Sequence, residues 1–235
     1  TEDGWHVAYR KTVDGGKTWS DEKIVATVNA DPARPPLPDI AVYDKKVHVV
    51  WGADLGNTEL FYGRSEDAGE TWLQPKQLID HYPYNYNVFS PQVAADGKYV
   101  HIVWADDRDE KREGSEIYYE RSNDGGITWS EDIRLTNAPK GCSGPKVILD
   151  GQYVHLFWMD GRDALGLPEG GWGYDVYYKR SEDYGATWSR DVRITARGPY
   201  AGMLPRSVAL GPGRMWVLCE EFGKDEPPFQ VYLTE

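Results

Sequence analysis

The chain has 235 residues, of which 40% are hydrophobic and 27% charged, and its formal net charge is −12. This length suits one large all-β domain or two small ones, and no apolar run approaches the roughly 18 residues that a membrane-spanning helix needs. The negative charge argues against a nucleic-acid partner, because an acidic surface repels phosphate. No signal-peptide pattern opens the sequence, and no helical periodicity is found in it.

The expected elements are short strands rich in β-branched and aromatic residues. The chain opens with the last two strands of one unit, continues through three units of four strands, and closes with three more, which predicts 17 strands. In chain order, the clearest runs are 5–11; 38–44, 46–54 and 58–65; 91–96, 98–107, 115–122 and 132–136; 145–150, 152–161, 174–181 and 191–195; 205–210, 214–222 and 230–235.

A ten-residue segment follows the third strand of the first four units. It reads KTVDGGKTWS at 11–20, RSEDAGETWL at 64–73, RSNDGGITWS at 121–130 and RSEDYGATWS at 180–189. Its aspartates recur at intervals of 53, 57 and 59 residues, at Asp14, Asp67, Asp124 and Asp183. Four-stranded antiparallel units at this period predict a β-propeller, with one sheet per blade around a channel.

The repeated segment has the composition of a tight hairpin turn. In the third copy, the Asp124 carboxylate can accept backbone N–H bonds across the loop, while Gly125 and Gly126 can take positive φ. Thr128 can tie the turn further, and the Trp129 ring can pack between neighbouring sheets. A carboxylate that recurs four times at equivalent places is expected to be structural and not catalytic.

The pattern S-x-D-x-G-x-T-W resembles the Asp box, or BNR repeat, of the sialidase superfamily, and the resemblance covers nearly the whole chain. It implies a single all-β domain over residues 1–235, a β-propeller of four-stranded antiparallel blades. The strands fit four or five blades, with five preferred, or an incomplete six-bladed sialidase ring. Asp boxes also occur in other glycoside hydrolases and in propellers without known chemistry, so function must be argued from the site.

The resemblance implies a glycoside hydrolase that releases terminal sialic acid or a similar acidic sugar, with a glycan partner and an extracellular or secreted location. Such a site needs arginines that bind the sugar carboxylate bidentately. It also needs a tyrosine nucleophile with a glutamate base, and an aspartate as acid and base. The alternative is a non-catalytic Asp-box propeller that binds glycan or protein. No cofactor or metal is expected in either case.

Five residues are candidates for sugar binding. Arg34 stands before a first strand but lacks the isoleucine of the family's R-I-P motif, and Arg206 opens the first strand of the last unit. Arg108 and Arg162 lie in segments that resemble the D-x-R segment of sialidases, although both segments also suit salt-bridged surface loops. Trp172, in an insertion before a third strand, suits stacking on a sugar ring.

The candidate catalytic residues come from the D-x-R segments and from the last unit. The acid and base candidates in the first segment are Asp107 and Asp109, and Asp163 corresponds to Asp109 in the second segment. The tyrosine–glutamate pair would combine Glu220 or Glu221 with a tyrosine from a nearby loop. The tyrosines weighed for this role are Tyr200, Tyr84 and Tyr86.

The last unit departs from the repeat. Aligning MWVLCEEF (215–222) on VHIVWADD (100–107) places Cys219 at the position of Trp104 and Glu221 at that of Asp106. This departure favours chemistry in the last unit, but terminal repeats also differ simply because they cap or close a ring.

Two further residue types are expected to be structural. Three histidines recur at one register, at His48, His101 and His155, whereas a general base or metal ligand would be unique. The only cysteines, Cys142 and Cys219, have neither zinc-site spacing nor a disulfide framework, and one bridge between them is left open.

Overall fold

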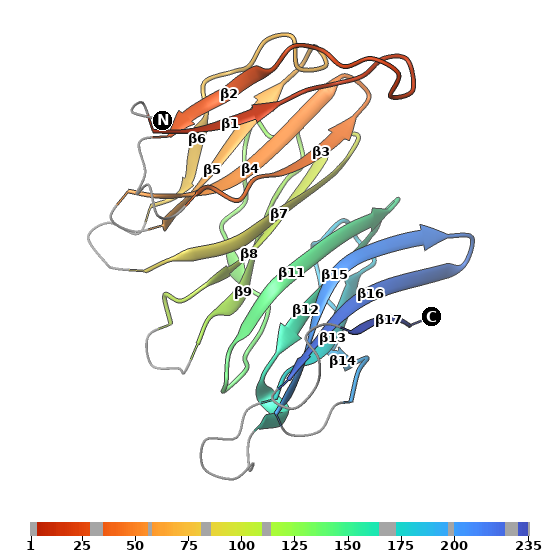
Figure 1. Ribbon diagram of the computed structural model, residues 1–235. Coiled ribbons are helices and arrows are strands. Elements are labelled where there is room, and N and C mark those ends of the chain that lie inside the picture. Colours follow the sequence, from red (N-terminus) through yellow and green to blue (C-terminus); the bar gives the residue numbers. More distant parts are fainter. Residues whose placement is uncertain are drawn as a thin grey trace.

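The structure is a computed structural model that describes residues 4–28, 35–55, 58–80, 86–109, 114–164, 173–196, 200–223 and 230–234. Within these ranges, 17 β-strands are accompanied by one turn of 3-10 helix, η1 (Arg162–Ala164). No helix in the described ranges is long and apolar enough to cross a bilayer. The all-β prediction and the expected number of strands are confirmed, and the strands form five antiparallel sheets (Figure 1).

Each sheet keeps its strands in chain order. Three complete four-stranded sheets lie between a two-stranded sheet and a three-stranded one. The strands are β1 (Trp5–Tyr9) and β2 (Lys23–Val28); β3 (Asp39–Tyr43), β4 (Lys46–Asp54), β5 (Thr58–Ser65) and β6 (Lys76–Ile79); β7 (Val88–Asp96), β8 (Tyr99–Asp106), β9 (Glu116–Ser122) and β10 (Ile133–Arg134); β11 (Cys142–Asp150), β12 (Tyr153–Asp160), β13 (Asp175–Ser181) and β14 (Val192–Arg193); β15 (Ala201–Gly211), β16 (Arg214–Gly223) and β17 (Gln230–Thr234).

The first strands of the later sheets begin earlier than the sequence predicts. β7, β11 and β15 start several residues before Pro91, Pro145 and Pro205, which were expected to open them. The pairing shifts register next to each of these prolines. Proline has no N–H to donate, so a sheet accommodates it at a bulge. The same strands are therefore longer than predicted and bent near their starts.

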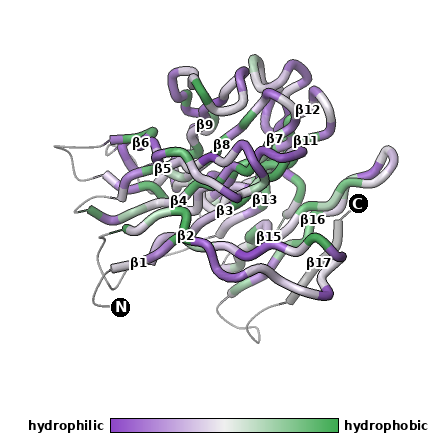
Figure 2. Tube along the Cα trace, turned by 90° about the horizontal axis from the view of Figure 1, so that it is seen from above, coloured by the Kyte–Doolittle hydropathy of each residue, from purple (hydrophilic) through white to green (hydrophobic). Residues whose placement is uncertain are grey.

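Consecutive sheets pack on one another through apolar side chains. Val7 contributes to a cluster with Trp51 of the next sheet, and the following interfaces are built in the same way around Trp104, Trp158 and Met203. The three tryptophans are at most 1% exposed. Figure 1 shows this series running from the β1–β2 sheet at one end of the molecule to the β15–β17 sheet at the other. Figure 2 shows hydrophobic stretches alternating with hydrophilic ones along the trace, as expected for stacked sheets.

The Asp box is a hydrogen-bonded turn, as predicted. In the third copy, Asp124 accepts a bond from the Thr128 backbone N–H at 2.9 Å and one from the Thr128 hydroxyl at 2.5 Å. The Ser122 hydroxyl donates to the same carboxylate at 2.7 Å and accepts from the Gly126 N–H at 2.8 Å. Gly125 and Gly126 have φ values of 77° and 83°, which favour glycine. The other three boxes repeat the two threonine bonds.

Each of the last three Asp boxes also binds the preceding sheet. The Tyr62 hydroxyl lies against Gly126, and the Tyr62 ring meets Trp129 edge-on with ring centroids 4.8 Å apart. Arg64 donates to the Gly125 carbonyl at 2.9 Å. Equivalent contacts join Tyr9, Lys11, Gly69 and Trp72, and then Tyr119, Arg121, Gly185 and Trp188. We call this set of contacts the box interface.

The repeated histidines form hydrogen bonds with the tyrosines that occupy the box-interface position. His101 forms a 2.7 Å hydrogen bond with the Tyr119 hydroxyl, and His48 and His155 bond Tyr62 and Tyr178 in the same way. Burial lowers the pKa of His101 to about 3 and that of His48 to about 4. These two side chains are therefore neutral, which fits their expected structural role.

Replacing Asp124 by alanine removes the carboxylate that ties the third box. We expect Asp124→Ala to lower the free energy of unfolding by about 1–2 kcal/mol, because several turn donors lose their acceptor. Urea denaturation measures the effect. Asp96→Ala, at the end of β7 beside the turn to β8, is the matched control, and an equal loss in both variants would contradict the role of the box.

The boxes also make stability depend on acid pH. The hydroxyl and backbone N–H of Thr71 hold the pKa of Asp67 at about 2, against an ordinary 3.8, and Thr187 does the same for Asp183. A lowered folded-state pKa stabilises the fold above the unfolded pKa, and this contribution is lost as pH falls through the folded pKa. We expect the stability difference between the wild type and an Asp67→Asn, Asp183→Asn variant to shrink from pH 4 to pH 2 in thermal unfolding scans. A constant difference over this range would contradict the assignment.

Candidate functional site

The Asp boxes and the D-x-R segments can be located on the sheets from the strand pairing. In the second complete sheet, Asp106 at the end of β8 pairs with Val88 at the start of β7. Near the other end of β8, Val100 pairs with Ser122, the serine of the third Asp box. The Asp boxes and the D-x-R segments thus lie at opposite ends of the strands. The first strands begin at the D-x-R end, where their bulges lie.

The first D-x-R arginine is held within its own sheet. Arg108 contacts Asp106 at 2.6 Å and Asp132 at 2.5 Å, and its guanidinium carbon lies 4.2 Å from the centroid of the Tyr118 ring. Asp106 has a fully buried side chain and also accepts a bond from the Trp104 indole N–H at 2.9 Å. These contacts occupy the guanidinium with protein groups.

The second D-x-R arginine repeats this arrangement in the next sheet. Arg162 contacts Asp160 at 2.6 Å and Asp191 at 2.7 Å, and it lies over the Tyr177 ring at 4.4 Å. The Trp158 indole N–H donates to Asp160 at 2.8 Å. The repetition favours the salt-bridged loop over a sugar ligand as the explanation of both segments.

The remaining acids of the segments also bind protein groups. Asp109 accepts bonds from the Tyr118 hydroxyl at 3.0 Å and from Arg134 at 2.7 Å. Asp163 accepts a bond from the Tyr177 hydroxyl at 2.6 Å. Asp107 has no acidic counterpart in the next sheet, where Gly161 stands at its position. It accepts bonds from the backbone and side-chain nitrogens of Asn87, at 2.5 and 3.1 Å.

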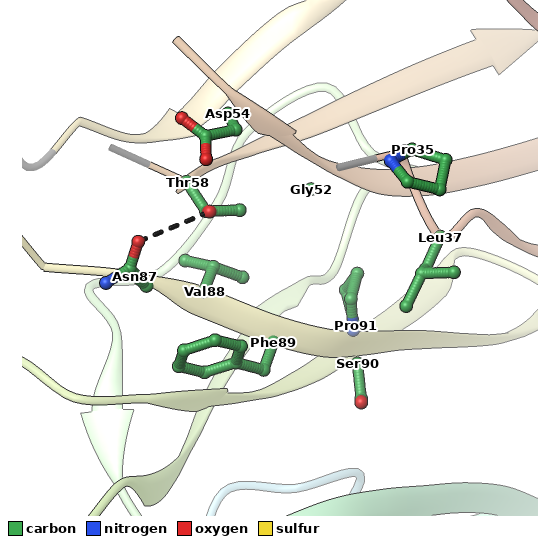
Figure 3. A pocket seen from close by; sticks show the side chains of 10 residues that line it. All are labelled: Pro35, Leu37, Gly52, Asp54, Thr58, Asn87, Val88, Phe89, Ser90 and Pro91. Atoms are coloured by element: carbon green, nitrogen blue, oxygen red, sulfur yellow. Dashed lines mark hydrogen bonds between the residues drawn. The ribbon is translucent and has the colours of Figure 1, made fainter. Parts of the chain in front are cut away.

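A cavity lies beside Asn87 at the D-x-R end, between the first and second complete sheets. Its volume is about 330 Å³, within the range of roughly 300–1,000 Å³ for small-ligand pockets. Figure 3 shows the side chains that line it: Pro35, Leu37, Gly52, Asp54, Thr58, Asn87, Val88, Phe89, Ser90 and Pro91. We call it the first-strand pocket.

The first-strand pocket combines apolar and polar walls. Phe89 is 42% exposed. Figure 3 shows the Asp54 carboxylate beside Thr58, and the Asn87 amide two residues before Phe89 on the same segment of the lining. The Thr58 hydroxyl donates to the Asn87 amide oxygen at 3.4 Å. Ser90 has φ of 49° at the bulge of β7, a left-handed conformation that non-glycine residues seldom adopt. An exposed ring beside hydrogen-bonding groups suits a sugar.

Four polar side chains continue from this pocket across the first strands. Each follows the proline near the start of its strand, and they are Asp39, Gln92, Lys146 and Arg206. Asp39 accepts the Val93 backbone N–H at 2.9 Å, Lys146 donates to the Gln92 amide oxygen at 2.8 Å, and Arg206 pairs with Glu220. We call this set the first-strand row.

Burial shifts the pKa of two ionisable groups in the first-strand row. It raises the pKa of Asp39 and lowers the pKa of Lys146, and the two residues lie close enough to interact electrostatically. Lys146 also interacts with Arg206. A carboxyl group that stays protonated to higher pH than usual suits a proton donor.

A family model for the BNR repeat-like domain matches residues 2–221. The chain belongs to this family. Among curated proteins, no sequence matches this BNR-repeat chain.

Solved structures of glycoside hydrolases share the fold of this BNR-repeat chain. An α-L-arabinanase of Penicillium chrysogenum, solved with arabinobiose, is 14% identical with a TM-score of 0.57, over 97% of this chain and 70% of that one. A GH93 α-L-arabinofuranosidase of Fusarium graminearum is 17% identical with the same TM-score, over 97% and 73%. A Trypanosoma rangeli sialidase is 14% identical with a TM-score of 0.59, over 99% of this chain but 39% of the sialidase. The sialidase-like propeller fold is thereby confirmed.

The second and third strands of the last sheet align with the repeat as the sequence predicts. Cys219 is fully buried, like Trp104, and Glu221 pairs with Gln230 as Asp106 pairs with Glu116. The predicted placement of Cys219 at the position of Trp104 and of Glu221 at that of Asp106 is therefore confirmed. The first strand differs, because β15 has one more residue than β7 between its proline and the turn, and its pairing shifts between Pro205 and Ser207. Arg206, which lies at this shift, pairs with Glu220.

Other predicted residues lie around the last sheet or outside the described ranges. Tyr200 precedes β15 with φ of 64°, and Glu221 pairs with Met203 through the backbone. Tyr86 is described just before β7. The positions of Arg34, Trp172 and Tyr84 lie outside the described residues. Cys142 and Cys219 are both buried thiols, so the optional bridge between them is absent.

Sequence reasoning missed three members of the first-strand row: Asp39, Gln92 and Lys146. A signal for them was available. The residue after the repeated proline changes from Asp to Gln, Lys and Arg, while the hydrophobic residues around it keep their pattern. Variation at one register of an otherwise regular repeat indicates positions that the repeat itself does not require.

Removing Arg108 tests whether the D-x-R arginines are structural. We expect Arg108→Ala to lower the free energy of unfolding by about 3 kcal/mol, because it leaves the buried Asp106 carboxylate without its cationic partner. Urea denaturation of Arg108→Ala and of the exposed Arg190→Ala gives the comparison. If Arg108→Ala is as stable as the control, the ion pair contributes little and Arg108 becomes available as a ligand.

Proposed function

We propose that this chain is a glycan-directed propeller with glycoside hydrolase activity, and that its sugar binds at the D-x-R end. The observation that carries the proposal is the first-strand pocket, which opens beside the first-strand row. The glycoside hydrolases with the same fold support the class of reaction. An extracellular location is part of the same proposal.

The residues of the first-strand pocket and those of the first-strand row suit separate roles. Phe89 offers an exposed ring for the apolar face of a sugar, and Asn87 and Asp54 offer hydrogen bonds to its hydroxyl groups. Asp39, whose pKa is raised by burial, suits the general acid that protonates the leaving oxygen. Glu220, paired with Arg206, is available as the second carboxylate.

The finer form of the proposal is release of a terminal acidic sugar such as sialic acid. Lys146 and Arg206 supply positive charge in the row and favour an anionic substituent on the sugar. The ion pairs of Arg108 and Arg162 favour a second candidate, a non-catalytic propeller that binds glycan. The hydrolase would cleave the glycan that it binds, whereas the non-catalytic propeller would only bind it.

A panel of fluorogenic glycosides tests the proposal, with sialosides and α-L-arabinofuranosides assayed from pH 4 to 8. We expect Asp39→Asn to lower kcat at least about 100-fold, the usual contribution of a general acid, with little change in KM. Asp44→Asn, an exposed aspartate at the far end of the same sheet, is the matched control and should retain full activity.

If no turnover is found, a glycan-binding measurement distinguishes a non-catalytic glycan-binding propeller from a protein that does not bind glycan. Binding without turnover, measured by calorimetry or on a glycan array and lost in Phe89→Ala, would support the second candidate and reject the hydrolase. A folded protein with neither turnover nor binding would reject both.

A further inference from the structure

A second cavity lies between the β1–β2 sheet and the β3–β6 sheet. Its volume is about 260 Å³. The residues that line it come from β2, β4 and β5 and from the connections next to them, and they are Ala26, Thr27, Val28, Trp51, Leu55, Phe61, Gln74 and Pro75. We call it the β2–β5 pocket. None of its lining residues is charged, and none belongs to the first-strand pocket.

The β2–β5 pocket and the first-strand pocket lie on opposite faces of the β3–β6 sheet. Successive residues of a strand point to opposite faces of its sheet. Trp51 and Leu55 line the β2–β5 pocket, whereas Gly52 and Asp54 line the first-strand pocket. A ligand in the β2–β5 pocket therefore leaves the proposed glycan site open.

The wall on the other side of the cavity is an outer strand with its usual partner. β2 pairs with β1 in the way that β6, β10 and β14 each pair with the third strand of their sheet. Val28 of β2 packs with Trp51 in the core between the two sheets. Both walls of the β2–β5 pocket therefore have the strand pairing of the later sheets.

In the next two sheets, the space beside the equivalent tryptophan is filled by a cluster of ion pairs. The Arg108 guanidinium lies over the Tyr118 ring. It also contacts the carboxylates of Asp106 and Asp132. Arg162 makes the same set of contacts in the β11–β14 sheet. A charged cluster is thus the ordinary filling of this space in the repeat.

The β3–β6 sheet has apolar residues in place of the whole cluster. The strand pairing fixes the correspondence, because Trp51 pairs with Phe61 in the way that the next sheet pairs its tryptophan with its tyrosine. The replacements are Ala53 for Asp106, Leu55 for Arg108, Phe61 for Tyr118 and Pro75 for Asp132. Leu55 is 53% exposed and leaves the space of the guanidinium open. The loss of every charge of the cluster is therefore accompanied by a cavity.

The same replacements leave the indole N–H of Trp51 without a carboxylate acceptor. The indoles of Trp104 and Trp158 donate to the aspartates of their clusters at 2.9 and 2.8 Å. Ala53 has no side-chain acceptor, and no hydrogen bond of the Trp51 indole is found within the described part of the chain. Trp51 is only 1% exposed, and a buried donor without a partner is unfavourable. An acceptor atom bound in the cavity would satisfy this N–H.

We propose that the β2–β5 pocket binds a small, neutral aromatic molecule that carries one hydrogen-bond acceptor, such as an aryl ketone. The ring of the ligand takes the place of the guanidinium and packs against Phe61 and Leu55, and its oxygen accepts the Trp51 N–H. A cavity of roughly 150 Å³ already holds benzene, so this one has room for a ring and a short substituent. The ligand is neutral because the lining offers no counter-charge, and a buried unpaired charge is costly.

A titration of the full chain with acetophenone, followed by NMR, tests the proposal. The matched ligands are ethylbenzene, which lacks the acceptor, and benzoate, which carries a charge. We expect acetophenone to shift the Trp51 indole N–H signal and to bind with a Kd of about 1 mM or below, which a ligand of this size can reach. Ethylbenzene should bind about threefold more weakly because it cannot accept the hydrogen bond. Benzoate should bind at least about tenfold more weakly because its charge finds no partner.

Two variants that fill the β2–β5 pocket locate the binding site. The double variant Ala53→Asp, Leu55→Arg restores the ion pair of the next sheets, and Leu55→Trp fills the space with an uncharged ring. Each should weaken acetophenone binding at least about tenfold, because the space is occupied. Leu73→Arg, at a leucine 49% exposed in the second Asp box, is the control and should bind as the wild type does. Thermal unfolding shows that each variant is folded.

Three results would overturn the proposal: no shift of the Trp51 signal up to the solubility limit of acetophenone, benzoate binding as tight as acetophenone binding, or undiminished binding in a folded pocket-filling variant. Equal binding of ethylbenzene and acetophenone would contradict the hydrogen bond to Trp51, and with it the stated class of ligand. Because none of these readouts involves sugar, the outcome is independent of the glycoside assays.

Discussion

The fold depends on one repeated interaction, the binding of an aspartate carboxylate by a threonine of its own turn. Asp124 and Thr128 show it in the third copy. The bond fixes the turn, and the fixed turn presents a glycine and a tryptophan to a tyrosine of the preceding sheet. Because the same turn both closes a hairpin and joins two sheets, local and tertiary structure are stabilised together.

This arrangement divides each sheet into an end whose residues repeat from sheet to sheet and an end whose residues differ between sheets. At the Asp-box end, the sheets must repeat the same residues because each box has to fit the sheet before it. At the D-x-R end, the first strands begin at bulges and the residue after the proline is free to differ. The first-strand row and the first-strand pocket are both found there, so the proposed chemistry lies where the repeat imposes least.

The D-x-R segments illustrate how an arginine can be mistaken for a ligand. Arg108 and Arg162 stack on tyrosines and pair with buried aspartates in two adjacent sheets. A buried carboxylate needs such a partner, since an unpaired charge in the interior is costly. The repetition that suggested a binding motif is therefore accounted for by the packing of each sheet.

The sequence by itself determined the all-β class, the Asp-box turns and the order of the strands, because these follow from local composition and from spacing along the chain. It also placed Arg206 at a first strand. Only the tertiary structure decided how β15 pairs with β16, since the pairing shifts between Pro205 and Ser207 and Arg206, which lies at this shift, pairs with Glu220. The grouping of Asp39, Gln92 and Lys146 was decided in the same way, because residues more than 50 positions apart meet only when the sheets pack side by side.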